Sequence, residues 1–410
     1  MKCRHCRAAL TRSFLELGSA PPSNAYLSVV ALAAPEVWFP LRVLVCEQCW
    51  LVQTQDHAGR DLLFASDYAY YSSFSSSWLA HSRDYVQDMR ERFALDANRL
   101  VVEVASNDGY LLQYVQSAGV PCYGIEPTAG TAAAARAKGI EVVEQFFGTA
   151  LAESLSSQGR QADLMVANNV LAHVPDINDF VAGFARLLKP HGVATFEFPH
   201  LLRMVQGCQF DTAYHEHYSY LSLTAVQRIL AANGLQVFDV SELPTHGGSL
   251  RVFAQRLDGG RHTPRPAVQD LLLREQRQGI CSAAFYAGFQ EQAVRIKQDL
   301  LRFLLQARSE GKTVGAYGAA AKGNTLLNFA GIRPDLLPYV VDSNPAKQGR
   351  YLPGSRIPIV DRAHLLAQRP DFVLILPWNL KAEVVAQLQD IAAWGGRFVT
   401  AVPALEVAES

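Results

Sequence analysis

Two pairs of cysteines near the start of the chain could hold a metal ion. Cys3 and Cys6 are separated by two residues, and so are Cys46 and Cys49. Each pair places two thiolates on one tight turn, and two such turns can close a tetrahedral site of one zinc ion and four sulfurs. Because no ligand position is left for a substrate, we expect a structural zinc. Two unrelated surface pairs or a redox pair are the alternatives, although no strand–helix–strand pattern surrounds these cysteines.

A turn between residues 103 and 109 could hold a nucleotide cofactor. The apolar run 100–104 indicates a buried strand, and Ala-Ser-Asn-Asp-Gly follows it before a helical pattern begins. Small residues let a cofactor approach the backbone, and Glu126, about twenty residues further on, could accept hydrogen bonds from ribose hydroxyls. The turn lacks G-x-G-x-x-G and its Asp108 would repel phosphate, so it favours S-adenosylmethionine over NAD. A β-hairpin turn is the alternative.

Seven consecutive residues, 214–220, combine two histidines, one carboxylate and three tyrosines. The His-x-His pattern could bind a metal, but it lacks a third ligand at helical spacing. A general base needs a histidine beside a carboxylate or phenol that tunes it, and this segment supplies both. A polar, hydrogen-bonded loop without chemistry is the alternative.

A loop rich in glycine and alanine, 315–324, follows a predicted strand and opens a predicted helix. Small residues allow backbone N–H groups to face a phosphate, and Lys322 adds positive charge. The order G-x-x-x-x-G-K of a P-loop is absent. Asp342 ends the next predicted strand. A simple tight turn between a strand and a helix is the alternative.

The elements that must position these segments follow from the pattern of the rest of the chain. At ~150 residues per domain, 410 residues predict two or three domains. Predicted strands at 100–104, 122–125, 164–167 and 193–198 alternate with helical stretches, which indicates a parallel, doubly wound sheet. The segments 235–240 and 250–254 predict a hairpin that closes this sheet.

A second α/β alternation begins after the Gly- and Pro-rich linker 257–266 and a long helical pattern. Its predicted strands lie at 313–316, 339–342, 372–376 and 398–402. We therefore expect three parts. Residues 1–66 form a small, irregular zinc-binding module, 67–256 a cofactor-binding α/β domain, and 257–410 a C-terminal Rossmann-like α/β domain.

Charge and composition disfavour several classes of function. The 37 basic and 38 acidic residues leave a net charge of −1, which gives no general attraction to nucleic acid or anionic lipid. No apolar run reaches the ~20 residues that cross a bilayer, and the N-terminus has no apolar signal segment. Seven cysteines are too sparse for a disulfide framework. We expect a cytoplasmic, monomeric protein without nucleic-acid or membrane partners.

Taken together, these segments resemble the sugar C-methyltransferases of unusual deoxysugar biosynthesis. The resemblance spans essentially the whole chain and rests on the cysteine pairs, the turn 103–109, and the segments Asn-Asn-Val-Leu-Ala-His-Val (168–174), Tyr-His-Glu-His (214–217), Gly-Ala-Ala-Ala-Lys-Gly-Asn-Thr (318–325) and Val-Asp-Ser-Asn-Pro (341–345). It implies a class I methyltransferase sheet, S-adenosylmethionine as cofactor, and a nucleotide-linked keto-deoxysugar as substrate. It also implies thymidine diphosphate as the carrier and methylation at C-3.

The resemblance also implies roles for individual residues. A base removes a proton beside the sugar ketone, and the enolate attacks the methyl group while preorganised donors stabilise its oxygen. By position, the catalytic residues are His217 as the base, Glu216, Tyr214, Tyr68 and His173. Residues expected at the cofactor are Glu103, Ala105, Ser106, Asn107, Gly109, Glu126, Pro127, Asn168 and Asn169. Those expected at the substrate are His246, Lys322, Asn324, Asn344, Arg350, Trp378 and Asn379.

Two other functions fit parts of the sequence. An NAD-linked oxidoreductase or epimerase acting on a nucleotide sugar would use the C-terminal block as its Rossmann unit. A zinc-ribbon protein that binds nucleic acid or a protein partner would use the cysteine pairs, although the chain carries no basic stripe.

Overall fold

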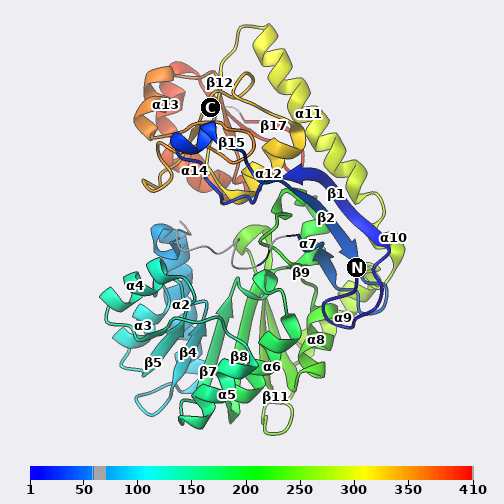
Figure 1. The fold of residues 1–410 in the computed structure, drawn as a ribbon, viewed down its shortest axis with the longest axis vertical. Helices are drawn as coiled ribbons and strands as arrows, with labels where there is room; N and C mark the ends of the chain where they lie inside the picture. Colours follow the sequence, from blue (N-terminus) through cyan, green and yellow to red (C-terminus); the bar gives the residue numbers. More distant parts are fainter. Residues whose placement is uncertain (58, 60–70, 409–410) are drawn as a thin grey trace.

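The computed structural model describes residues 1–57, 59 and 71–408, which form two α/β domains and an N-terminal sheet beside them (Figure 1). The central domain occupies the lower half of Figure 1 and the C-terminal domain the upper half. The N-terminal strands lie along one side, next to the long helix α11 (Phe289–Ser309).

The central domain contains a seven-stranded sheet in the order β10-β11-β8-β7-β4-β5-β6. Strands β8, β7, β4, β5 and β6 are parallel, β11 is antiparallel to β8, and β10 is antiparallel to β11. This order confirms the predicted doubly wound sheet and its closing hairpin. The strands are β4 (Val101–Val104), β5 (Cys122–Ile125), β6 (Val142–Val143), β7 (Ala162–Asn168), β8 (Leu188–Pro199), β10 (Leu235–Leu243) and β11 (Ser249–Arg256).

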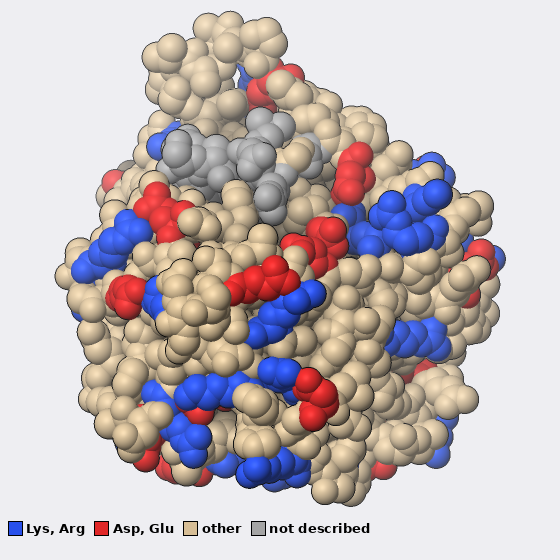
Figure 2. Space-filling view, turned by 60° about the horizontal axis from the view of Figure 1, so that its bottom comes forward, with Lys and Arg blue, Asp and Glu red and all other residues tan. Residues whose placement is uncertain are grey.

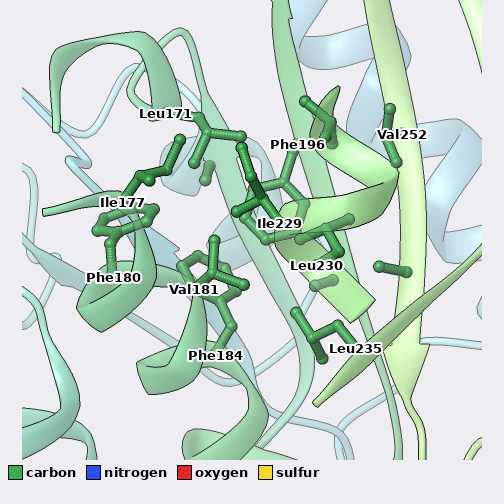
Figure 3. Packing of buried hydrophobic residues seen from close by; sticks show 14 of the residues in the cluster. Leu171, Ile177, Phe180, Val181, Phe184, Phe196, Ile229, Leu230, Leu235 and Val252 are labelled. Carbon is green, nitrogen blue, oxygen red and sulfur yellow. The ribbon is translucent and has the colours of Figure 1, made fainter. Parts of the chain in front are cut away.

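Helices cover both faces of this sheet because each carries one apolar stripe. They are α2 (Ser76–Phe93), α3 (Leu112–Ser117), α4 (Ala129–Ala137), α5 (Thr149–Ser157), α6 (Ile177–Leu187), α7 (Leu201–Gln206) and α8 (Leu223–Ala232). Helix α6 buries Ile177, Phe180, Val181 and Phe184, at the spacing of one helix face. Figure 3 shows these side chains packed with Phe196 of β8 and with residues of α8. Truncating Phe184 to alanine would cost about 3–5 kcal/mol of folding free energy.

The N-terminal module contains a four-stranded antiparallel sheet, which the expectation of an irregular module did not include, and its first two strands pair with two register shifts. Its strands are β1 (Arg12–Ala20), β2 (Phe39–Val45), β3 (Val52–Thr54) and β9 (Ser219–Tyr220), in the order β1-β2-β3-β9. Apolar residues of β1 pack against the helix α11. The rings of Phe14 and Phe289 stack there, with their centroids 4.5 Å apart. Strand β9 comes from the central part of the chain, so the module is completed by a segment far away in sequence.

The C-terminal domain has a six-stranded sheet in the order β14-β13-β12-β15-β16-β17. All neighbours are parallel except the last pair. Its strands are β12 (Val314–Tyr317), β13 (Val340–Val341), β14 (Ile359–Val360), β15 (Phe372–Ile375), β16 (Arg397–Thr400) and β17 (Glu406–Val407), and its helices are α12 (Ala321–Ala330), α13 (Arg362–Gln368) and α14 (Lys381–Gln387). The order reverses between β12 and β15, and ligands of doubly wound sheets bind at such a switch point.

The segment between the two α/β domains runs along both. Helix α9 (Pro266–Arg277) packs on β10 and α8 of the central domain. Its fully buried Glu275 accepts hydrogen bonds from the backbone N–H groups of Leu223 and Thr224 and from His200. A short helix, α10 (Ala283–Tyr286), then leads to Gly288, whose φ of 79° separates it from α11. The expected long helix is therefore broken at this glycine.

The surface shown in Figure 2 carries basic and acidic side chains close to one another, with no broad area of one sign. Most of the ion pairs are exposed, and such pairs contribute about 0–1 kcal/mol each. Among the helices of the described residues, none combines the length and apolar character that a membrane span requires.

Candidate active site and zinc centre

The four N-terminal cysteines converge on one point. The sulfurs of Cys3 and Cys49 lie 3.5 Å apart, those of Cys6 and Cys46 lie 3.4 Å apart, and all four lie within 4.8 Å of one another. A tetrahedral zinc with Zn–S bonds of about 2.3 Å would hold its sulfurs about 3.8 Å apart. The geometry therefore fits the predicted structural zinc.

The backbone around each cysteine pair is shaped for this role. The N–H of Arg7 donates to the carbonyl of Cys3, and the N–H of Trp50 donates to that of Cys46. Arg7 and Trp50 both have positive φ, 66° and 62°, a conformation that costs energy for a residue with a side chain. Zinc would hold the turns closed against this cost, and the Gln53 amide also donates to the Cys3 sulfur.

The predicted cofactor turn leaves the carboxyl end of β4 in a left-handed conformation. Ala105 and Asn107 have φ of 57° and 48°, and Gly109 has 75°. A Cβ at Gly124 of β5 would lie 2.2 Å from the Ser106 hydroxyl, so the turn presses against the next strand. This close approach explains why β5 has a glycine at position 124.

Glu126, at the carboxyl end of β5, faces this turn. Its two carboxylate oxygens accept hydrogen bonds from the N–H groups of Asn107 and Thr128, both at 2.9 Å. Burial raises the pKa of this carboxyl, and these backbone hydrogen bonds partly oppose the rise. Pro127, between Glu126 and Thr128 in the sequence, begins the connection to α4. Glu126 therefore orders the turn.

Two more predicted cofactor residues are buried at the carboxyl edge of the sheet. Glu103 on β4 is fully buried, and burial raises the pKa of its carboxyl well above the usual range, with Tyr110 close by. The amide oxygen and nitrogen of Asn168, at the end of β7, are buried without a hydrogen-bond partner among the described residues. Unsatisfied buried polar atoms are rare, so Asn168 is a candidate for contact with a ligand.

The segment that we predict to be catalytic lies between the 3₁₀ turn η4 (Phe210–Thr212) and strand β9. Nδ1 of His217 donates to the carbonyl of Thr212 at 2.9 Å. Nε2 therefore carries the lone pair, and it accepts from the hydroxyl of Tyr214 at 2.8 Å. Burial lowers the pKa of His217 well below its usual value, so the ring is neutral near pH 7.

The other expected catalytic residues take different places. His173, in the turn η3 (Leu171–His173) after β7, donates from Nδ1 to the carbonyl of Glu216, and its ring lies 4.6 Å from that of His217. The Glu216 carboxylate turns away from both histidines and accepts from the N–H and the side-chain amide of Asn24. Tyr68 lies outside the described residues.

The predicted substrate residues of the C-terminal domain divide into two groups. Lys322, in the first turn of α12, donates to the Asn379 side chain at 2.6 Å, and its ammonium lies over the ring of Trp378. These three lie at the switch point between β12 and β15. Burial lowers the pKa of Lys322, and its charge in turn lowers the pKa of His217. Lys322 therefore faces the catalytic segment across the domain boundary.

The second group forms contacts within the C-terminal domain, except that the side-chain amide of Asn324 also donates to the carbonyl of Ser23 at 3.5 Å. Asn324 is buried in α12 and accepts from the amide of Asn328, which also donates to its backbone carbonyl. The side chain of Asn344 accepts from the N–H of Ala346 within its own turn. Arg350 follows in the same loop, and its backbone bonds to Ile359. The structure does not bring this group together with Lys322.

His246 lies beside the end of β7 in the central domain. It sits in the turn η5 (Thr245–Gly247) with a φ of 54°, and Nε2 accepts from the side-chain amide of Asn169 at 3.1 Å. Burial lowers its pKa to about 4, and the positive charge of Lys322 adds to the effect.

Sequence reasoning missed one charged cluster beside this site. Glu197, fully buried on β8, binds His81 of α2 at 2.9 Å and Arg251 of β11 at 2.9 Å. Trp78 stacks on His81 and also contacts the ring of His246. The signal was present, since Glu197 interrupts the apolar run of β8 between two phenylalanines. A charge in a buried strand requires a partner.

Comparison with known proteins accounts for nearly all of the chain. Residues 3–64 match a zinc binding domain, residues 78–240 a methyltransferase domain, and residues 244–403 a C-methyltransferase C-terminal domain. The chain is 34% identical over 402 residues to the C-methyltransferase NovU of Streptomyces niveus, an alignment that covers 98% of this chain and 95% of NovU.

Solved structures resemble only part of the molecule. The PH0226 protein from Pyrococcus horikoshii is 12% identical, with a TM-score of 0.39, over 46% of this chain and 95% of that one. Magnesium protoporphyrin IX methyltransferase from Synechocystis, with S-adenosylhomocysteine bound, is 16% identical, with a TM-score of 0.34, over 44% of this chain and 84% of that one.

The identity to NovU over the full length, together with the three matched domains, decides the family. The central domain has the class I methyltransferase fold, and the four cysteines form the zinc site of the N-terminal domain. The chain is an S-adenosylmethionine-dependent enzyme with a structural zinc, and it belongs to the family of C-methyltransferases.

Proposed function

We propose that this C-methyltransferase methylates C-3 of a nucleotide-linked 4-keto-deoxysugar, with thymidine diphosphate as the carrier. The observation that carries the proposal is the neutral His217, paired with Tyr214, at a place where the cofactor domain and Lys322 of the C-terminal domain meet. S-adenosylmethionine, held by the turn after β4 and by Glu126, supplies an electrophilic methyl group. The resemblance to sugar C-methyltransferases supplies the substrate class.

His217 acts as the base through Nε2, because Nδ1 already carries the proton that it donates to Thr212. The proton beside the sugar ketone moves to Nε2 as the C–H electron pair forms the enolate. The Tyr214 hydroxyl occupies the Nε2 lone pair in this structure, so it has to turn away from Nε2 before the proton moves. It then donates to the ketone oxygen that becomes the enolate oxygen. The enolate carbon forms the new bond to the methyl carbon as the carbon–sulfur bond breaks.

The C-terminal domain holds the nucleotide diphosphate. Lys322 and the N–H groups at the start of α12 form an anion site at the switch point of the sheet. A groove of about 600 Å³, lined among others by Tyr317, Asp342 and Gln348, offers room for the nucleoside at the carboxyl end of β13. Binding energy from this remote group would hold the sugar between the domains.

An experiment with deuterated water tests this function. The protein is incubated with a dTDP-4-keto-deoxysugar, and mass spectrometry follows deuterium at the carbon beside the ketone without cofactor and methyl gain with it. We expect both with the native chain and neither with His217→Asn. Methylation of an unlinked ketone at the same rate, or no reaction with any nucleotide-linked ketosugar, would contradict the proposal. The oxidoreductase alternative would instead show a change in NADH absorbance.

A further inference from the structure

Trp378 of the C-terminal domain reaches into the central domain at its catalytic segment. Its indole N–H donates to Oδ2 of Asp211 at 2.8 Å. A Cβ on Gly247 would lie 2.5 Å from the indole ring, so the ring packs directly on the backbone beside His246. Trp378 therefore contacts both loops of the central domain that carry catalytic or substrate histidines.

Among the described residues, Trp378 is the side chain that hydrogen-bonds Asp211. The Asp211 side chain is fully buried, its Oδ1 has no hydrogen-bond partner in the described part of the chain, and the backbone N–H groups of Asp211 and Thr212 help to stabilise the carboxylate. A buried polar atom without a partner costs folding free energy, and such groups persist where function requires them. Burial raises the pKa of Asp211 to about 6, while the charge of Lys322 opposes the rise.

The backbone links Asp211 directly to the residue that hydrogen-bonds the proposed base, His217. Asp211 is the central residue of η4, and the next residue, Thr212, supplies the carbonyl that binds Nδ1 of His217. That hydrogen bond fixes both the tautomer and the direction of Nε2. A movement of η4 would therefore rotate the lone pair that removes the substrate proton.

We infer that the hydrogen bond from Trp378 to Asp211 is a positioning contact, through which the C-terminal domain fixes η4 and so aims His217. The inference rests on the proposed role of His217. It also reassigns Trp378, which we expected to bind the substrate: its N–H is used by Asp211 and its ring lies under Lys322. Because Lys322 belongs to the proposed anion site, the same tryptophan joins nucleotide binding to the orientation of the base.

The substitution Trp378→Phe removes the indole N–H but keeps an aromatic ring under Lys322. We expect kcat and deuterium exchange beside the ketone to fall roughly ten- to a hundredfold, as for a misplaced catalytic group. The KM of the nucleotide sugar and the affinity for the cofactor should stay within about twofold, since no ligand contact is lost. Asp211→Asn should retain most of the activity, because its amide oxygen still accepts from the indole, whereas Asp211→Ala should not.

Trp394→Phe provides a matched control in the same domain. Its indole N–H donates to the carbonyl of Pro370 at 3.0 Å, and in the part of the chain that the structure describes this indole makes no hydrogen bond to the central domain. We expect it to lower the melting temperature and leave kcat unchanged. If Trp378→Phe likewise affects only the melting temperature, or raises KM without lowering kcat, the positioning role is wrong.

The nitrogen NMR signals of the His217 ring test the contact without any substrate. In the native chain, we expect the Nδ1-protonated tautomer, and in Trp378→Phe a mixture of tautomers. This measurement keeps the two proposals apart. Unchanged ring signals in Trp378→Phe would overturn the positioning contact, whereas a failure of the native chain to exchange deuterium would overturn only the proposed function.

Discussion

The two α/β domains share one hydrogen-bond arrangement at the ends of their first two strands, and they differ in the charges around it. In the central domain, Glu126 after β5 accepts from the N–H of Asn107 in the turn after β4, at 2.9 Å. In the C-terminal domain, Asp342 after β13 accepts from the N–H of Ala319 in the turn after β12, at 2.8 Å. In both, an acid from the second strand fixes the turn of the first.

The charge near each turn indicates what each can bind. The central turn contains Asp108, which lies 3.6 Å from Lys138, and Glu126 faces the same turn. Burial raises the pKa of Glu103 well above its usual range, so Asp108 and Glu126 are the acids that would favour a sulfonium cation. In the C-terminal domain, Lys347 lies 3.6 Å from Asp342 and donates to the carbonyl of Ala319, and Lys322 follows in the helix. This surrounding suits a phosphate. Under the proposed function, one fold would hold a cation in the central domain and an anion in the C-terminal domain.

Removing zinc should have the largest effect, because the N-terminal sheet contacts both halves. Structural zinc contributes about 10–16 kcal/mol of binding free energy in small domains. We expect elemental analysis to find about one zinc per chain, and Cys46→Ser to lose both metal and activity. Cys281→Ser, at an exposed cysteine, is the control. A metal-free chain with full thermal stability would exclude this role.

The substitution His217→Asn should stop chemistry in the central half without affecting either ligand. Loss of a general base typically lowers turnover ~100- to 10,000-fold. Calorimetry should show unchanged affinity for cofactor and nucleotide sugar, and mass spectrometry should show loss of deuterium exchange. His191→Asn, at an exposed histidine bonded to the Gly259 carbonyl, is the control. Exchange that survives within a few-fold would assign the base to another residue.

The substitution Lys322→Ala should weaken binding of the nucleotide sugar by the C-terminal domain. A charge-assisted hydrogen bond contributes about 1.5–3 kcal/mol, so we expect the KM of the nucleotide sugar to rise roughly ten- to a hundredfold. Cofactor affinity, measured by calorimetry, should not change. Lys312→Ala, which breaks an exposed ion pair with Asp371, is the control. An unchanged KM would show that the phosphates bind elsewhere.

Exchanging the two equivalent acids for amides compares the halves directly. Glu126→Gln should weaken cofactor binding by ~1–3 kcal/mol and leave the nucleotide sugar unaffected. Asp342→Asn should do the reverse, and isothermal titration with each ligand in turn measures both. If either variant weakens both ligands equally, the acid acts on the stability of its domain and the division of labour fails.

The pH dependence of stability should show the smallest effect. Burial lowers the pKa of His173 to about 4 from 6.5, so the unfolded chain binds more protons as the pH falls below 6.5. The native chain should lose about 2 kcal/mol of stability from this residue between pH 7.5 and pH 5. Urea unfolding at both values should find that loss missing in His173→Asn. An equal loss in both chains would indicate that His173 is not buried as a neutral ring.

Sequence patterns predicted the parts of this molecule that depend on local order. The strand–turn–helix at 103–109 and the cysteine pairs can be recognised from the spacing of nearby residues. The doubly wound sheet and the zinc site could therefore be predicted from the sequence. The contacts of Glu216 did not, because its neighbour Asn24 lies almost two hundred residues away and nothing local indicates the pairing. The N-terminal sheet was missed for the same reason, since β9 is remote in sequence. Glu197 in an apolar strand was a signal that could have been used.

The pairing of β9 with β3 has a consequence for anyone who recombines these enzymes. The segment that carries His217 ends in a strand of the zinc-binding sheet, and the turn at 23–24 of that sheet holds Glu216. A methyltransferase domain exchanged at its sequence borders would therefore bring β9 without the β3 of its own parent. It would also bring the Glu216 carboxylate without its own hydrogen-bond partner at residue 24. Functional hybrids should instead take β3, residues 21–27 and the segment 210–220 together from the same parent enzyme.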